Sequence, residues 1–155
     1  MTATDDTRPA AGGRRAPRQR ILFLCTHNSA RSQMAEGLLR ARGGDRFEAF
    51  SAGTEATEVR PLAIRAMDEV GIDIRGQWSK RLDDYVARPF DAVVTVCDNA
   101  REACPVFPGA RRSLHWSFDD PSAATGTDAE RLAVFRRVRD EIDARVRGMV
   151  EGGAD

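Results

Sequence analysis

Residues 21–36 read ILFLCTHNSARSQMAE, and this stretch decides how the rest of the chain is interpreted. Its first four residues are apolar and predict a short buried strand, and apolar residues recur at helical spacing from Met34 onward. A strand that turns directly into a helix directs its last backbone N–H groups to one spot, where the helix dipole is positive. The stretch therefore predicts a strand, an oxyanion-binding loop and a helix.

Cys25 lies just before this loop and Arg31 at its end, and the two side chains indicate which reaction the loop could support. A guanidinium can hold two oxygens of one anion, and the field that attracts an anion also stabilises a thiolate. Ser32 follows directly, and its hydroxyl can hydrogen-bond the Cys25 sulfur. The alternative is a core cysteine at a strand end, because free cysteine is among the most buried residue types. The strand before, the helix after and the small polar residues between favour anion capture followed by thiolate attack.

Length and composition place the chain among single-domain globular proteins. It has 155 residues, of which 41% are hydrophobic and 31% charged, enough for one core. No apolar run approaches membrane-spanning length and no signal-peptide pattern precedes Ile21, so a cytoplasmic location is expected. The net charge of zero provides no global field for nucleic acid or membrane partners. Three cysteines in a reducing compartment indicate reactive or metal-bound thiols rather than a disulfide framework.

Strand and helix patterns alternate after residues 1–19, which lack periodicity and are expected to form a disordered tail. The expected helices run from the loop to about Arg42, from Pro61 to Gly71, briefly from a Ser79 cap, and from a Thr127–Glu130 capping box onward. Further strands are expected at 47–52, at 90–96, and along the alternating Leu114, Trp116 and Phe118.

This alternation predicts an α/β fold, a four-stranded parallel sheet with helices on both faces, as one catalytic domain at residues 20–150. Sites in such sheets lie beyond the carboxyl ends of the strands. Cys25 and Cys97 both end strands, so we expect them to share that edge.

Cys97 and Cys104 have six residues between them. A rigid helix would separate them by about 10 Å along its axis, whereas a disulfide needs Cα atoms within about 7 Å. Pro105 and Pro108 favour a loop. The functional interpretation is a resolving pair, in which Cys97 attacks Cys25 and Cys104 then attacks Cys97. The alternatives are two unrelated buried thiols, or a zinc site with His115 that no ligand spacing supports.

Asp120 precedes Pro121 just after the fourth strand. A carboxyl there could donate a proton to an oxygen leaving the bound anion, and an Asp-Pro turn is an equally good interpretation. His27 lies inside the anion loop, where we expect a solvated side chain on a loop whose backbone does the binding. Trp78 and Trp116 are expected to be core or packing residues.

These residues together resemble the thioredoxin-coupled arsenate reductases, built on the low-molecular-weight protein tyrosine phosphatase fold. The similarity covers residues 20–150, and its markers are residues 25–36, 51–53, 94–97 with Cys104-Pro105, and 115–121.

The resemblance implies a role for each matching residue. Cys25 would attack arsenate, supported by Ser32, and Asp120 would be the general acid. Cys97 would attack Cys25 and release arsenite, and Cys104 would move the disulfide to a Cys97–Cys104 pair that thioredoxin reduces. The loop that would hold arsenate, and equally phosphate or sulfate, comprises Thr26, His27, Asn28, Ser29, Ala30 and Arg31. No bound cofactor is implied, and we expect a monomer.

Two departures from the family pattern stand out. His27 occupies a position where family members often carry glycine. Some relatives bind potassium beside the loop through an Asn, a Glu, a Ser and an acidic residue. Asn28, Glu36 and Ser51 match that set, but Lys80, the only lysine, stands at the acidic position. We hypothesise that the Lys80 ammonium replaces the ion, so that activity does not need potassium.

Three other functions are compatible with part of this residue pattern. A tyrosine phosphatase would use Cys25, Arg31 and Asp120 equally, but the residues after Pro121 are small rather than aromatic. An arsenate reductase drawing on a low-molecular-weight thiol such as mycothiol needs only Cys25. A non-catalytic oxyanion binder needs no thiol. The presence of Cys97 and Cys104 argues against all three.

Overall fold

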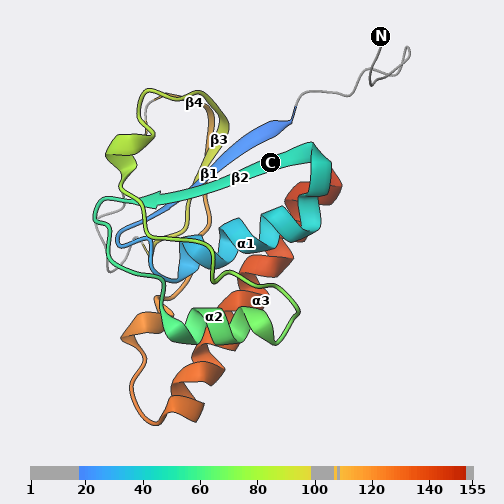
Figure 1. The fold of residues 1–155 in the computed structure, drawn as a ribbon. Helices are drawn as coiled ribbons and strands as arrows, with labels where there is room; N and C mark the ends of the chain where they lie inside the picture. The colour runs from blue at the N-terminus through green and yellow to red at the C-terminus, as the bar shows by residue number, and fades with distance from the viewer. Residues whose placement is uncertain (1–17, 99–106, 108, 153–155) are drawn as a thin grey trace.

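The computed structural model describes residues 18–98, 107 and 109–152 (Figure 1). Its main elements are β1 (Gln19–Cys25), α1 (Arg31–Gly43), β2 (Phe47–Gly53), α2 (Pro61–Asp68), β3 (Phe90–Thr95), β4 (Ala110–His115) and α3 (Asp128–Gly152). Short 3-10 helices lie at η1 (Gly44–Arg46), η2 (Leu82–Asp84) and η3 (Pro121–Ala123). The expected tail falls on residues outside the described ranges, apart from Arg18 and from Gln19, which begins β1.

The four strands form one sheet in the order β2-β1-β3-β4, and every pairing is parallel. The predicted four-stranded parallel sheet is therefore confirmed. Because all strands run the same way, their carboxyl ends meet at one edge, and the loop after β1 lies at that edge.

The two faces of the sheet are covered differently: of the helices expected on both faces, the described residues place α1, α2 and α3 on one face and only the short η2 on the other. Ile21, Phe23 and Cys25 of β1 pack with α1, α2 and α3, which lie on one side of the sheet in Figure 1. Leu22 and Leu24 face the other side, where the cover comes from the segment around η2 and from Phe107. A strand covered on both faces needs apolar residues at successive positions, which is the pattern of β1.

Several predicted boundaries are confirmed. α1 ends at Gly43, and α2 starts at Pro61, whose fixed φ suits a first helical turn. The capping box before α3 is formed, because the Thr127 N–H donates to Glu130 Oε1 (2.8 Å) and the Glu130 N–H donates to Thr127 Oγ1 (3.1 Å). In the described ranges, no helix has the length and apolar character needed to cross a membrane.

Two local predictions are wrong. The fourth strand ends at His115, so Trp116 and Phe118 follow it as buried side chains instead of alternating within it. β4 is an edge strand with exposed residues at 111–113, so it carries no apolar signal. Ser79 does not cap η2, whose N-cap is Arg81. The Ser79 hydroxyl instead donates to the carbonyl of His27.

Candidate active site

In the loop after β1, the carbonyl groups of residues 26–29 all accept hydrogen bonds from donors that lie away from the inner side of the loop. The pairs are Thr26 O with Thr54 Oγ1 (3.1 Å) and Glu55 N (3.0 Å), His27 O with Thr57 Oγ1 (3.2 Å) and Ser79 Oγ (3.1 Å), Asn28 O with Gln33 Nε2 (3.1 Å), and Ser29 O with Arg60 N (2.9 Å). In a planar trans peptide the N–H points opposite to the C=O. The following N–H groups are therefore directed inward, where an anion would lie.

Asn28 shapes this loop from within. Its φ of 51° lies in the left-handed region, which asparagine tolerates better than most residues. Its fully buried side chain accepts from the Lys80 N–H (2.7 Å) and from Gln33 Nε2 (2.9 Å) through Oδ1, and donates from Nδ2 to Ser32 Oγ (2.8 Å). Because the Lys80 N–H can only donate, the orientation of the Asn28 amide is fixed.

Ser32 links the fixed Asn28 amide to Cys25, the candidate nucleophile. Cys25 is 2% exposed, and its Sγ lies 2.8 Å from Ser32 Oγ. The Ser32 oxygen accepts from Asn28, so its own hydrogen is available to the Cys25 sulfur. The Cys25 sulfur therefore lies at the base of the loop with a hydroxyl donor beside it and the inward N–H groups above it.

Arg31 and Asp120 meet on the other side of the loop. Arg31 is the first residue of α1, and its NH1 donates to the Phe118 carbonyl at 3.2 Å. Its NH2 lies 3.7 Å from Asp120 Oδ2. The other Asp120 oxygen accepts from the Ser122 N–H (2.9 Å), so Asp120 also serves the turn that the sequence suggested. The Asp120 oxygen that lies near Arg31 is therefore not the one that binds the turn.

A buried charge cluster lies behind the loop. Glu36 Oε1 accepts from Ser51 Oγ (2.5 Å) and Lys80 Nζ (3.3 Å), and Oε2 pairs with Arg40 NH2 (2.5 Å). Lys80 Nζ also donates to the Trp78 carbonyl at 2.7 Å. Burial lowers the pKa of Lys80 from its usual value and Arg40 acts in the same direction, whereas Glu36 opposes the shift. Asn28, Glu36, Ser51 and Lys80 are brought together.

Potassium does not fit this arrangement. Both Glu36 oxygens already have partners, and the Lys80 ammonium lies where a cation between Glu36 and the Trp78 carbonyl would otherwise bind.

His27 and Trp78 lie at the outer surface of the site. The His27 side chain is 47% exposed, with Nε2 at 3.7 Å from Glu55 Oε1, and its carbonyl makes the structural contacts. The expectation that Trp78 is a core or packing residue is wrong, because it is 66% exposed. Its carbonyl binds Gln33 and Lys80, and its ring lies over the Lys80 ammonium (5.0 Å). Trp116 is buried as expected.

Cys25 and Cys97 lie at the carboxyl ends of neighbouring strands. Cys25 ends β1, and Cys97 is a buried residue just after β3, where the Val96 N–H donates to the Leu24 carbonyl (2.9 Å). Cys97 is disulfide-bonded, whereas Cys25 is a free thiol. Cys104 lies outside the described residues. Across the described ranges, no three His, Cys, Asp or Glu side chains come together as metal ligands, and His115 Nδ1 lies 2.6 Å from Thr95 Oγ1.

The comparison with known proteins decides the family. Residues 20–152 match the model of the low molecular weight phosphotyrosine protein phosphatases. The chain belongs to this family. An arsenate reductase from Halalkalibacterium halodurans is 50% identical over 133 residues, which cover 86% of this chain and 96% of the relative.

Two solved structures are also similar to this chain. An arsenate reductase in the phosphate binding state has a TM-score of 0.75 at 34% identity, over 86% of this chain and 98% of that one. A thioredoxin-dependent arsenate reductase from Corynebacterium glutamicum has a TM-score of 0.66 at 31% identity, over 88% of this chain and 62% of that one.

Other residues of the site make contacts that the sequence did not predict. Gln33 joins the loop to the Trp78 carbonyl, and Gln77 Nε2 donates to Gln33 O (3.0 Å) and Oε1 (2.8 Å). Gln33 is fully buried within α1, and a buried glutamine is uncommon, but burial is not visible in a single sequence. Thr57 gave no signal and Ser79 was expected only as a helix cap, because both donate to the His27 carbonyl, which is distant in the sequence. Gly53 lies so close to the loop that a Cβ would come within 2.7 Å of Thr26 O.

Proposed function

We propose that this chain reduces arsenate to arsenite by thiolate attack and a three-cysteine relay, and that thioredoxin regenerates it. The observation that carries the proposal is the loop whose carbonyls are all bound from outside, with Cys25 held by Ser32 at its base. The similarity to arsenate reductases along most of the chain supports the choice of substrate. The thioredoxin-dependent relative supports the choice of reductant.

In the first step, the loop N–H groups and Arg31 hold arsenate while the Cys25 thiolate attacks arsenic. An S–As bond forms, an As–O bond breaks, and Asp120 supplies the proton that lets the oxygen leave as water. Arg31 neutralises the anion with two parallel donors, which suits a tetrahedral oxyanion. Arsenic remains pentavalent at this stage.

In the second step, the Cys97 thiolate attacks the Cys25 sulfur. The S–As electron pair moves to arsenic, which leaves as trivalent arsenite, and a Cys25–Cys97 disulfide remains. Cys104 then attacks Cys97 and releases Cys25 as a thiolate, and thioredoxin returns two electrons to the Cys97–Cys104 disulfide. A disulfide-bonded Cys97 beside a free Cys25 is the combination that this last state requires.

Lys80 is proposed as an internal cation that positions the loop. Its backbone N–H fixes the Asn28 amide, and its ammonium balances the buried Glu36 carboxylate beside it. With the amine in this place, we expect catalysis to be independent of potassium.

The proposed unit is a single catalytic domain at residues 20–150 that acts as a monomer with no bound cofactor. We propose a cytoplasmic location, because a relay whose last disulfide is reduced by thioredoxin needs a compartment in which thioredoxin is kept reduced.

Phosphatase activity is the second candidate function. The family match and the Cys25, Arg31 and Asp120 arrangement would serve phosphate esters equally, since a phosphocysteine needs only water for its hydrolysis. The residues after Pro121 provide no aromatic side chain for a substrate ring. We therefore expect phosphatase turnover as a minor activity.

The proposal is tested by arsenate turnover with thioredoxin, thioredoxin reductase and NADPH. Three variants are run beside the unchanged protein: Cys25→Ser, Cys97→Ser and Cys104→Ser. Loss of steady-state turnover in all three supports the relay. Loss in Cys25→Ser alone contradicts it and favours the phosphatase or the reductase that uses a small thiol.

A further inference from the structure

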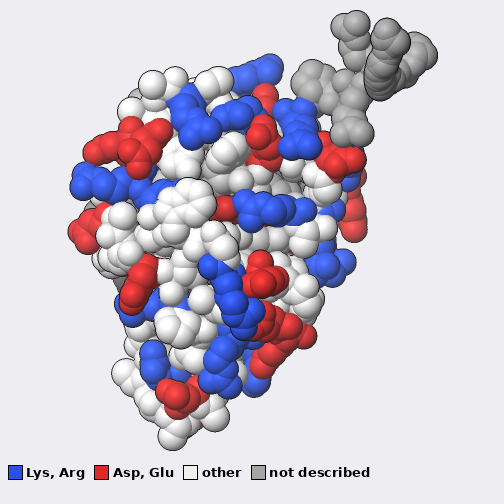
Figure 2. Space-filling view, viewed as in Figure 1, with Lys and Arg blue, Asp and Glu red and all other residues white. Residues whose placement is uncertain are grey.

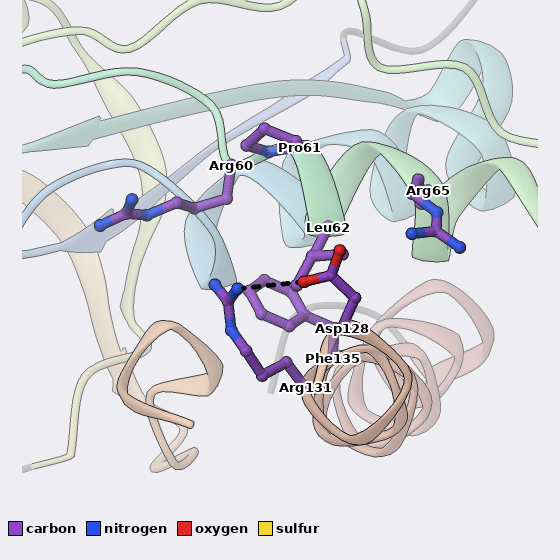
Figure 3. A pocket seen from close by; sticks show the side chains of 7 residues that line it. All are labelled: Arg60, Pro61, Leu62, Arg65, Asp128, Arg131 and Phe135. Atoms are coloured by element: carbon purple, nitrogen blue, oxygen red, sulfur yellow. Dashed lines mark ion pairs between the residues drawn. The ribbon is translucent and has the colours of Figure 1, made fainter. Parts of the chain in front are cut away.

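A cleft of about 240 Å³ lies where α2 and α3 begin, and the proposed reaction makes no use of it. Three arginines and one aspartate line it, over Leu62 and Phe135. Figure 3 shows Arg131 and Arg65 on opposite sides of these two apolar residues, with Asp128 near Arg131.

The charges in the cleft are unbalanced. Arg131 NH1 lies 3.5 Å from Asp128 Oδ1, but the side chains of Arg60 and Arg65 make no hydrogen bond or ion pair with any residue that the structure describes. Other exposed arginines, such as Arg136 and Arg137, are paired with carboxylates. Figure 2 shows positive and negative side chains mixed over the face it displays. The cleft is therefore a local concentration of positive charge on a protein of zero net charge.

The floor of the cleft limits what can bind there. Leu62 is 8% exposed and Phe135 is 1% exposed, so they offer little apolar surface to a ligand. Pro61 and the hydrocarbon parts of the arginines supply apolar surface, whereas the charge comes from the guanidinium groups, whose planar forks match the oxygens of phosphate-like anions. The excess of guanidinium groups over carboxylates favours a small oxyanion as the ligand.

The cleft is also connected to the catalytic loop. Arg60 precedes α2 directly, and its backbone N–H donates to the carbonyl of Ser29 (2.9 Å). Arg60, which lines the cleft, therefore also keeps the Ser29 carbonyl directed away from the inside of the loop. Positive charge beside an anion site raises the local concentration of the anion.

We propose that this cleft is a second binding site for tetrahedral oxyanions, which collects them beside the Cys25 loop. Its coupling to turnover rests on the proposed function, because arsenate must be the substrate. Oxyanion binding in the cleft does not depend on that reaction.

The binding is tested by titrating ¹⁵N-labelled protein carrying Cys25→Ser with sodium phosphate, at constant ionic strength set by sodium chloride. The amide signals of residues 60–65 and 128–135 are expected to saturate on a curve separate from those of residues 29–32. Adding Arg65→Gln and Arg131→Gln should weaken the affinity of the cleft for phosphate about tenfold, because two exposed ion pairs with the anion are lost. The affinity reported by residues 29–32 of the loop should not change. Arg112→Gln, an exposed arginine on β4, is the matched control.

A cleft response that is absent, or unchanged by the double substitution, would overturn the proposal. With Cys25 restored, the same double substitution should raise KM for arsenate about threefold without changing kcat, as expected for lost local charge. An unchanged KM would refute the coupling to the catalytic loop. If the protein failed to reduce arsenate at all, the phosphate titration would still decide whether the cleft binds oxyanions.

Discussion

The back of the anion loop and its mouth differ in how firmly their side chains are held. The back group consists of Asn28, Ser32, Gln33 and Lys80, all buried and joined by hydrogen bonds. The mouth group consists of His27, Glu55 and Asp120, whose side chains are 47%, 67% and 32% exposed. The buried hydrogen bonds of the back group therefore fix the oxyanion geometry, while the exposed mouth group leaves the loop open to substrate. Substitutions of the back group, or of residues that contact it, should therefore lower activity or stability more than substitutions at the mouth.

Arg31→Lys should have the largest effect, because Arg31 spans both regions. A lysine keeps the charge but loses the fork that can hold two oxygens and the bond to the Phe118 carbonyl. We expect kcat/KM for arsenate to fall about a thousandfold. The thermal midpoint should change little, and a mild kinetic effect would show that the loop N–H groups suffice without the fork.

Asn28→Ala should lower kcat/KM about a hundredfold by releasing Ser32 and the Lys80 N–H, and by placing alanine at a positive φ. Asn28→Gly separates these causes, since glycine accepts that φ and lacks the side chain. If Asn28→Gly were fully active, the hydrogen bonds of the back group would have no catalytic role. Steady-state arsenate kinetics of the two variants make the measurement.

Lys80→Met should lower the free energy of unfolding by about 2 kcal/mol, because Glu36 loses one buried partner but keeps Arg40 and Ser51. Chemical denaturation measures this loss, and Lys80→Arg is the charge-preserving control.

Potassium dependence tests the same residue. The unchanged protein should show equal kcat/KM in potassium chloride and tetramethylammonium chloride, whereas Lys80→Asp should gain stimulation by potassium. Strong stimulation of the unchanged protein would refute the role of Lys80 as an internal cation.

His27→Gly should change kcat/KM by no more than about twofold, because an exposed side chain with one distant carboxylate contributes little. The carbonyl contacts with Thr57 and Ser79 remain in glycine. A large loss on this substitution would mean that the mouth takes part in fixing the loop.

Glu69 belongs to neither group and should affect stability alone. Hydrogen bonds from Arg136, with help from Arg139, lower the pKa of Glu69 from 4.5 to about 2. Since the folded pKa is the lower one, the stabilisation is present above pH 4.5 and is lost as the pH falls toward 2. Glu69→Gln should flatten the acid dependence of the unfolding free energy and leave kcat/KM unchanged. Glu151→Gln, an exposed carboxylate late in α3, should change neither.

The sequence predicted those parts of the molecule whose signal is local. The apolar run of β1, the capping box at Thr127 and the glycine at the end of α1 each encode a boundary within a few residues, and all three are confirmed. β4 could not be located correctly, because an exposed edge strand shows no apolar pattern.

The site divides in the same way. Cys25, Arg31 and Ser32 lie close together in the sequence and could be proposed from it. Gln33 lies within the motif, but its hydrogen bond to the Trp78 carbonyl depends on the fold and could not be predicted. Thr57 and Ser79 bind the distant His27 carbonyl, so nothing in their own neighbourhoods indicated that contact. The expectation that Trp78 is a core or packing residue is wrong, because its carbonyl binds the buried Gln33 while most of the residue is exposed.

The relay is tested most directly by counting the arsenite that reduced Cys104→Ser releases with excess arsenate and thioredoxin. The account predicts one arsenite per protein, followed by arrest with a Cys25–Cys97 disulfide that peptide mapping detects. Continued turnover, or arrest without that disulfide, would contradict it.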